Sequence, residues 1–171
     1  RIISVAKDGR MIIWDAPSMR PLRRYDLEAG TMAGAAVDVT AARVSGDRLF
    51  VAAAVDEHIL RKGGREMIFK FHIAFFDVSK GVLLKVLEDN NRKIERLALY
   101  QGNCFVAFDN STLQNKSIAL RNIESGSLDL SYALERVCEN LEFSPDGRWL
   151  AGAVETDGGG GSELYLWSVE Y

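Results

Sequence analysis

Few residues in this chain have the types and spacing that active-site chemistry needs. The two histidines, His58 and His72, lie far apart, so we expect neither to bind a metal ion nor to act as a general base. Asp56 and Glu57 are adjacent, where strand alternation would point them apart, and we interpret them as charges in a solvated loop. The chain contains no Gly-x-Ser-x-Gly elbow, phosphate loop, HExxH or CxxC motif. The sequence therefore predicts a protein that is not an enzyme and uses no metal or cofactor.

The glycine and cysteine residues likewise give no sign of a phosphate-binding or metal-binding site. The glycine-rich segment 158–161 follows no phosphate-loop pattern and opens no helix, so we interpret it as a hairpin loop. Together with Ser162 it also has the composition of an engineered linker, which is the alternative. Cys104 and Cys138 are not closely spaced, and we expect buried free thiols. This favours a reducing compartment and an intracellular protein, cytoplasmic or nuclear.

Basic residues supply the candidate binding site. Arg61, Lys62 and Arg65 flank a Gly-Gly pair, and Arg92 and Lys93 lie in a later connection. Such a patch can meet an acidic or phosphorylated peptide through charge-assisted hydrogen bonds. The alternative is ordinary solvated loop charge. Nucleic acid is not expected as a partner, because the net charge is −3 and aromatic residues do not alternate with the basic ones.

The elements that must position these residues are clearest near the C-terminus. Residues 141–143 alternate as a strand, and Ser144-Pro145-Asp146-Gly147 has the residues of a tight turn. Residues 149–154 and 164–167 read as two more strands, joined by the glycine-rich loop. The second strand is nearly all apolar, which predicts cover on both of its faces. No apolar run reaches the roughly 18 residues of a membrane span, so no membrane partner is expected.

The same strand and turn pattern recurs upstream. We expect an all-β chain of about four sheets, at residues 1–27, 35–87, 94–132 and 137–169, with the first and last incomplete. Asp77 to Gly81 aligns with Asn122 to Gly126 at an offset of 45 residues, within the range of β-propeller blades. One longer interval implies an insertion, which we place at residues 56–66. A blade is a sheet sandwiched between two neighbours, which would provide the cover that the apolar strands need.

Two segments carry a family resemblance. A resemblance to WD-repeat blades is found in Asp8 to Asp15, with the sequence DGRMIIWD, and in the C-terminal stretch around Trp167. In the second segment, Ser168 stands where Asp is usual. The resemblance implies that a strand serine, a turn aspartate and the tryptophan share hydrogen bonds, and Ser4, Asp8 and Trp14 match these positions. In this reading Asp15, Asp146, Gly147 and Trp167 are likewise structural residues. SPDGRWLA and SELYLW also resemble repeats of TolB-like and prolyl-oligopeptidase propellers, the second choice.

The resemblance further implies a larger protein. The chain is expected to be part of a propeller of seven blades, opening at the second strand of one blade and closing after the third strand of another. The rest of that propeller is then a partner of this chain.

The function follows from the face on which the loops gather. The connections between second and third strands are expected to be long, at 56–66, 109–116 and 155–162, and to share one side of the propeller with the blade-to-blade connections. The turns Lys7 to Arg10 and Ser144 to Arg148 are tight, and we place them on the opposite side. Loops on a rigid scaffold are where binding residues concentrate. We therefore expect a non-enzymatic scaffold that binds a partner protein or peptide on its loop-rich face. The alternative is a propeller that gates access to a hydrolase domain elsewhere in the parent protein.

Overall fold

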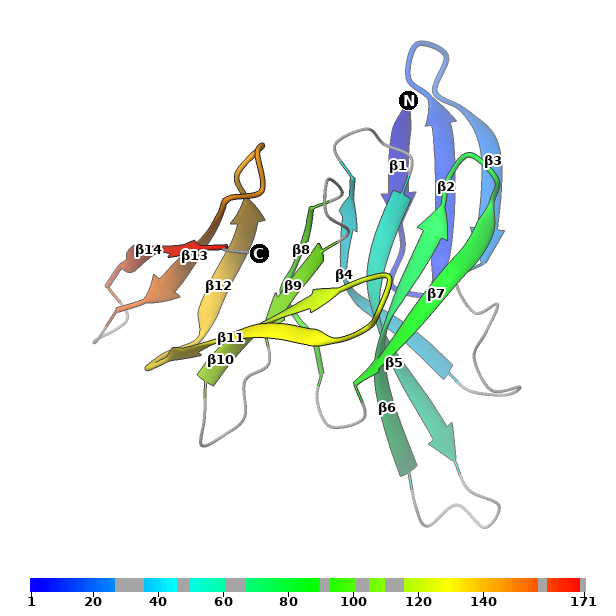
Figure 1. Cartoon of the computed structure of the whole chain (residues 1–171). Coiled ribbons are helices and arrows are strands. Elements are labelled where there is room, and N and C mark those ends of the chain that lie inside the picture. The colour runs from blue at the N-terminus through cyan, green and yellow to red at the C-terminus, as the bar shows by residue number, and fades with distance from the viewer. Residues whose placement is uncertain are drawn as a thin grey trace. The chain divides into compact units, whose positions relative to one another are not determined.

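The computed structural model describes residues 1–26, 36–45, 50–60, 67–89, 93–100, 105–109, 116–156 and 160–169. These residues form fourteen strands in four antiparallel sheets and no helix (Figure 1). None of them belongs to a helix that could cross a membrane. The chain divides into two compact units, Arg1–Lys93 and Ile94–Tyr171, with two sheets in each.

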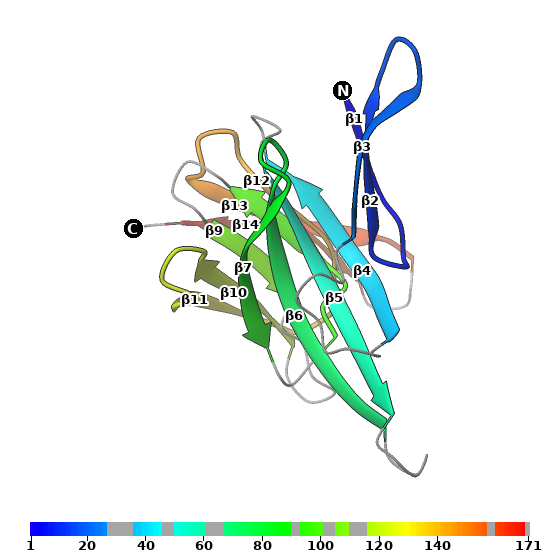
Figure 2. The ribbon, with the colours of Figure 1, turned by 90° about the vertical axis from the view of Figure 1, so that its right-hand side faces the viewer.

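The first unit contains blade 1 and blade 2, in which neighbouring strands are consecutive along the chain. Figure 2 gives a second view of these strands. Blade 1 consists of β1 (Ile2–Val5), β2 (Arg10–Asp15) and β3 (Arg20–Asp26). Blade 2 consists of β4 (Ala36–Val44), β5 (Phe50–Leu60), β6 (Met67–Asp77) and β7 (Val82–Asp89).

The second unit repeats this arrangement, again with antiparallel neighbours. Blade 3 consists of β8 (Leu97–Tyr100), β9 (Phe105–Asp109), β10 (Lys116–Asn122) and β11 (Leu128–Leu134). Blade 4 consists of β12 (Cys138–Phe143), β13 (Trp149–Glu155) and β14 (Ser162–Ser168). The prediction of four blades, with three-stranded first and last members, is confirmed. That residues 1–171 make up one continuous propeller segment, divided at the residues predicted above, stays a prediction.

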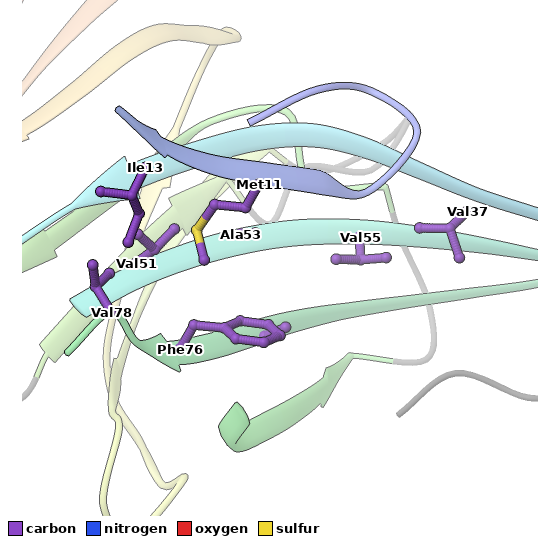
Figure 3. Close-up of a cluster of buried hydrophobic side chains, with 9 residues drawn as sticks. Met11, Ile13, Val37, Val51, Ala53, Val55, Phe76 and Val78 are labelled. Atoms are coloured by element: carbon purple, nitrogen blue, oxygen red, sulfur yellow. The ribbon is translucent and has the colours of Figure 1, made fainter. Parts of the chain in front are cut away.

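Each unit buries an apolar core between its two sheets. In the first unit, Met11 and Ile13 of β2 point onto the face of blade 2 that carries Val51, Ala53 and Phe76 (Figure 3). Alternation explains the choice of face, because Val51 and Ala53 stand on the same side of β5 and pair with Phe76 and Ala74 of β6. In the second unit, the core joins residues from both sheets: Ala98, Ala107, Ile118, Leu120, Cys138, Leu141, Phe143, Leu150 and Val169. One face of the apolar strands is thus covered within each unit, but the cover expected on both faces of residues 149–154 is missing among the described residues, since Trp149 is 48% exposed.

Serine and glycine define the turns between first and second strands. The hydroxyl of Ser144 accepts the N–H of Trp149 at 3.0 Å, and that of Ser45 accepts the N–H of Phe50 at the same distance. Gly147 follows Asp146 with φ of +72°, a conformation that costs glycine little. The predicted Asp-Gly turn is therefore present in blade 4, and the same serine device closes the corresponding turn of blade 2.

The prediction of a loop at residues 56–66 is wrong for residues 56–60, which belong to β5. β5 continues to Leu60, β6 begins at Met67, and the two residues pair with each other. The insertion therefore lengthens a hairpin, and six residues remain between the two strands. Asp56 and Glu57, expected in a solvated loop, lie on β5 and are each only 5% exposed. Their charges suggested a loop, but backbone pairing carries the strand through them.

Candidate functional site

In blades 2, 3 and 4, the second and third strands are connected at one end of the sheet. We call this end the loop end. The turn between β1 and β2 lies beside the start of β4, at the loop end of blade 2. The backbone carbonyl of Lys7 in this turn accepts a hydrogen bond from the N–H of Val39 at 2.7 Å. The side-chain Nζ of Lys7 is 3.3 Å from Oδ2 of Asp38. Asp38 pairs with Asp56 near the loop end of blade 2. The expectation that the Lys7 turn lies on the opposite side is therefore wrong, because Lys7 contacts Asp38 and Val39 at the loop end of blade 2.

The predicted basic patch falls largely outside the described residues. Arg61, Lys62, Arg65 and Arg92 all lie outside the residues that the structure describes. Lys93 is described, and its side chain is exposed. The patch therefore stays a prediction. β5 ends at Leu60 and β6 begins at Met67, so the described part of this hairpin stops on either side of the predicted patch.

A buried ionisable pair lies beneath this end of blade 2. Glu57 on β5 and His72 on β6 are 5% and 7% exposed, and Oε1 of Glu57 is 3.5 Å from Nδ1 of His72. Burial lowers the pKa of His72 below 6.5, although the charges of Glu57 and Glu88 act in the opposite direction. Lys70 adds to the lowering. The imidazole is therefore held in its neutral form, with the carboxylate of Glu57 beside it.

The two histidines do not come together. His72 pairs with Val55 and shares its face with Glu57, whereas His58 is the next residue along β5 and points to the other face. Among the described residues, no three His, Cys, Asp or Glu side chains are grouped to hold a metal ion. Cys138 is buried, is a free thiol, and has its pKa raised by burial, whereas Cys104 lies outside the described residues.

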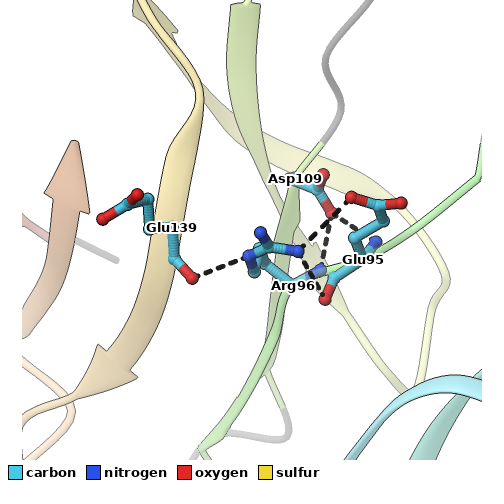
Figure 4. A network of polar contacts seen from close by, with 4 residues as sticks. All are labelled: Glu95, Arg96, Asp109 and Glu139. Atoms are coloured by element: carbon cyan, nitrogen blue, oxygen red, sulfur yellow. Dashed lines mark hydrogen bonds and ion pairs between the residues drawn. The ribbon is translucent and has the colours of Figure 1, made fainter. Parts of the chain in front are cut away.

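A polar network occupies the loop end of the second unit (Figure 4). Oδ1 of Asp109 accepts the N–H groups of Glu95 and Arg96, each at 2.9 Å. Burial raises the pKa of Asp109, while these two hydrogen bonds lower it. The guanidinium Nε of Arg96 donates to the carbonyl of Glu139 at 2.6 Å, and Oε2 of Glu139 accepts the hydroxyl of Ser162 at 2.7 Å. The network joins blade 3 to blade 4 beneath the connections of this end.

The second unit also contains an open pocket of about 590 Å³ at the loop end. It lies where β11 finishes, β13 finishes and β14 starts. Its described lining comes from both blades: Ala133, Leu134, Glu135, Arg136, Val154, Glu155, Thr156, Glu163 and Tyr165. The volume is within the range typical of ligand pockets in proteins.

Tyr165 is held in place by aromatic stacking. Its ring lies 5.9 Å from that of Trp167 at an interplanar angle of 22°, and Trp167 contacts Tyr132 of blade 3 at 5.6 Å. Tyr165 is nevertheless 41% exposed, and its hydroxyl is 3.4 Å from Oε2 of Glu163. The pocket is thus bordered by a fixed aromatic ring next to a carboxylate.

The residues assigned to the repeat motif have structural contacts. Nε1 of Trp14 donates to the hydroxyl of Ser4 at 2.8 Å, while Asp8 accepts the N–H of Arg10. Asp15 binds the N–H and hydroxyl of Ser18, and these bonds lower its pKa. Oδ1 of Asp146 accepts the hydroxyl of Ser144 at 2.6 Å and the N–H of Arg148 at 3.2 Å. Trp167 closes over Gly152, where a Cβ atom would lie 2.7 Å from its ring.

Sequence reasoning missed the pocket. Glu163, Tyr165 and Trp167 occupy alternate positions of β14 and so share one face, a signal that was available in the sequence. Glu135 and Arg136 come from the connection after β11, and only the packing of blade 3 against blade 4 brings them to Glu163. Glu155, taken as the start of a loop, ends β13 and pairs with Ser162.

Similarity to known proteins is found in structure alone. No protein-family model matches the chain, and no curated protein matches its sequence. Among solved structures, the chain superposes on U3-55K with a TM-score of 0.64 and 18% identity, over 98% of this chain and 45% of that one. The WD40 repeats of RRP9 give a TM-score of 0.63 with 16% identity, over 98% and 44%. The Dos1 propeller gives a TM-score of 0.61 with 12% identity, over 97% and 41%.

The matched structures extend well beyond this chain. The chain spans less than half of the length of each of these propellers. At such low identities the likeness establishes the fold. It agrees with the four antiparallel sheets, the Trp14–Ser4 hydrogen bond and the repeat interval. The chain therefore has a WD40-like β-propeller fold.

Proposed function

We propose that this protein is a non-enzymatic scaffold that binds a partner protein through the loop ends of its blades. The observation that carries the proposal is the position of the open pocket in the second unit. The pocket lies at the loop end of blades 3 and 4, beside connections that a rigid pair of sheets holds in place. Connections on a rigid scaffold commonly provide binding residues.

The basic patch belongs to this proposal as a second contact region. Arg61, Lys62 and Arg65 would meet acidic or phosphorylated groups of the partner, with Arg92 and Lys93 beside them. Each hydrogen bond to a charged group contributes about 1.5–3 kcal/mol, so a few such contacts suffice for specific recognition.

The proposal is tested by affinity capture from native lysate with the parent-length protein. The wild type is compared with the variant Arg61→Ala, Lys62→Ala, Arg65→Ala, and bound proteins are quantified by mass spectrometry. We expect a specific partner whose recovery falls by at least about tenfold in the variant, which corresponds to the loss of one charged contact. Circular dichroism establishes that both proteins are folded.

A matched control removes three cations from the opposite ends of the sheets. Arg20, Lys80 and Arg148 are exposed residues in or beside the turns at those ends. The variant Arg20→Ala, Lys80→Ala, Arg148→Ala changes the net charge equally and should capture the wild-type set of proteins. Equal loss in both variants would mean that overall charge, rather than the loop ends, holds the partner. If the wild type captures no specific partner, the scaffold proposal fails. The alternative, a propeller that gates access to a hydrolase domain elsewhere in the parent protein, is then favoured.

A further inference from the structure

The pocket of the second unit combines apolar lining residues with exposed charged ones, which we call its rim. Leu134 of β11 and Val154 of β13 are apolar lining residues, and Val154 is only 4% exposed. Glu135, Glu155 and Glu163 are exposed lining residues from three different segments of the chain. Arg136 is the one cation among the lining residues, so carboxylates outnumber it by three to one.

The aromatic ring of Tyr165 adds a second feature that favours a cation. The ring is half-exposed into the pocket region and fixed by its stacking on Trp167. Cations are attracted to the faces of aromatic rings, by about 0.5–1 kcal/mol at exposed sites. The hydroxyl of Tyr165 lies beside Glu163, which brings the ring and a carboxylate to the same part of the rim.

The charge of the second unit acts in the same direction. Residues 94–171 contain five Lys or Arg and twelve Asp or Glu, a formal charge of −7. Residues 1–93 contain sixteen Lys or Arg and twelve Asp or Glu, a formal charge of +4, and the two sum to the −3 of the chain. The field around the pocket therefore attracts a positively charged segment and repels phosphate groups.

We propose that this pocket binds the side chain of a lysine or arginine in an exposed segment of a partner protein. The aliphatic stem of such a side chain would pack on Leu134, Val154 and the Tyr165 ring, while its cationic head would meet the carboxylates of the rim. The inference rests on the proposed function, since its occupant belongs to a protein partner. It adds a basic segment to the acidic or phosphorylated one that the basic patch would take.

Peptide binding to the intact chain provides the test. Short fluorescein-labelled peptides of glycine and serine carry one central lysine, arginine, acetyl-lysine or glutamate, and binding is followed by fluorescence anisotropy. The lysine and arginine peptides should bind at least about tenfold more tightly than the acetyl-lysine and glutamate peptides. Acetylation removes the charge and retains the stem, and comparison of lysine with arginine shows which head group the pocket prefers. Affinity should fall as salt is raised.

Variants locate the binding. The pair Glu155→Gln, Glu163→Gln keeps side-chain size at the rim and should weaken lysine-peptide binding by about tenfold. The control pair Glu124→Gln, Glu142→Gln removes two exposed carboxylates of the same unit outside the pocket, and should change affinity by less than about twofold. Tyr165→Leu should weaken binding by about threefold. Arg136→Gln removes the competing cation and should tighten it.

The outcomes separate this inference from the proposed function. If the lysine peptide binds no better than the acetyl-lysine peptide, or if both carboxylate pairs weaken it equally, the pocket is not the site. The scaffold proposal still stands in that case, provided that lysate capture remains sensitive to the Arg61, Lys62 and Arg65 variant. Failure of both experiments removes the scaffold proposal itself.

Discussion

Glu57 and His72 are the most deeply placed pair of opposite ionisable types among the described residues. Both lie on the face of blade 2 that turns toward blade 1, on the same side of the sheet as Val51 and Ala53. A buried charge is costly unless it is paired, and burial here favours the neutral imidazole. The carboxylate of Glu57, the carboxylate of Glu88 and the ammonium of Lys70 are the charged groups that act on it.

The pH dependence of stability should report this pair. Because folding lowers the pKa of His72 below 6.5, the unfolded chain binds a proton at this residue more readily than the folded chain. Its contribution to stability is therefore fully present above pH 6.5 and is lost as the pH falls, with a slope of at most about 1.4 kcal/mol per pH unit. Urea denaturation between neutral pH and pH 5 measures it. His72→Gln should have a shallower decline, while the half-buried His58, changed to Gln, serves as control. Identical slopes in all three proteins would contradict the assignment.

At the scale of elements, tyrosines tie together the two blades of each unit. The Tyr25 hydroxyl of β3 donates to the carbonyl of Val78 after β6, and the Tyr132 hydroxyl of β11 donates to that of Ser168 at the end of β14. Tyr100 of β8 donates to the carbonyl of Asp146 at 3.0 Å. These contacts put aromatic rings directly over turn glycines in both units, at Gly81 and Gly147.

Gly147 should therefore tolerate substitution poorly. A Cβ atom there would lie 2.1 Å from Cε1 of Tyr100, and its φ of +72° disfavours any other residue. Gly147→Ala should cost about 1–2 kcal/mol for the backbone alone, plus the clash with the ring. In a Tyr100→Leu background the clash is relieved, and the backbone cost should remain. Chemical denaturation of the four proteins in the cycle measures the coupling. Gly160→Ala, with nothing within 4 Å, should be nearly neutral, and a similar cost there would contradict this account.

At the scale of the whole molecule, the outer face of blade 4 is open among the described residues. Leu164 and Leu166 are 72% and 61% exposed and share a face with Trp149, which is 48% exposed. In a complete propeller, a following blade covers such a face. An apolar face beside the edge strand β14 favours association between copies of the chain.

The isolated chain should therefore self-associate through blade 4. Leu164→Lys with Leu166→Lys should weaken association by at least about tenfold, since burying half of each leucine contributes about 1.5 kcal/mol in total. Sedimentation velocity over a range of concentrations measures the effect. The matched variant is Val82→Lys with Leu84→Lys on β7, where the exposed residues are 45% and 49% exposed and flank half-buried Leu83. Equal weakening in both variants would show that blade 4 is not the contact.

Local patterns made much of the fold predictable. Apolar alternation, turn residues such as Asp146-Gly147 and the 45-residue interval identify four blades, because each blade is one supersecondary unit with its own signals. The prediction of a solvated loop at Asp56 and Glu57 was wrong. Two adjacent charged residues are typical of a loop, and only the pairing of β5 with β6 shows that they belong to a strand. The basic patch lies mainly outside the described residues and stays a prediction.

The sequence alone determined the four sheets of this protein and the Asp146-Gly147 turn, because these depend on residues close together in the chain or on a repeated interval. The Ser4–Trp14 contact was implied by the resemblance to WD repeats. Only the tertiary structure decided where charge is buried and where it gathers. His72 lies beside Glu57 across a hairpin, and Glu135 and Glu163 line one pocket from two blades. Such placements depend on register and on the packing of one sheet against another, which no single stretch of sequence encodes.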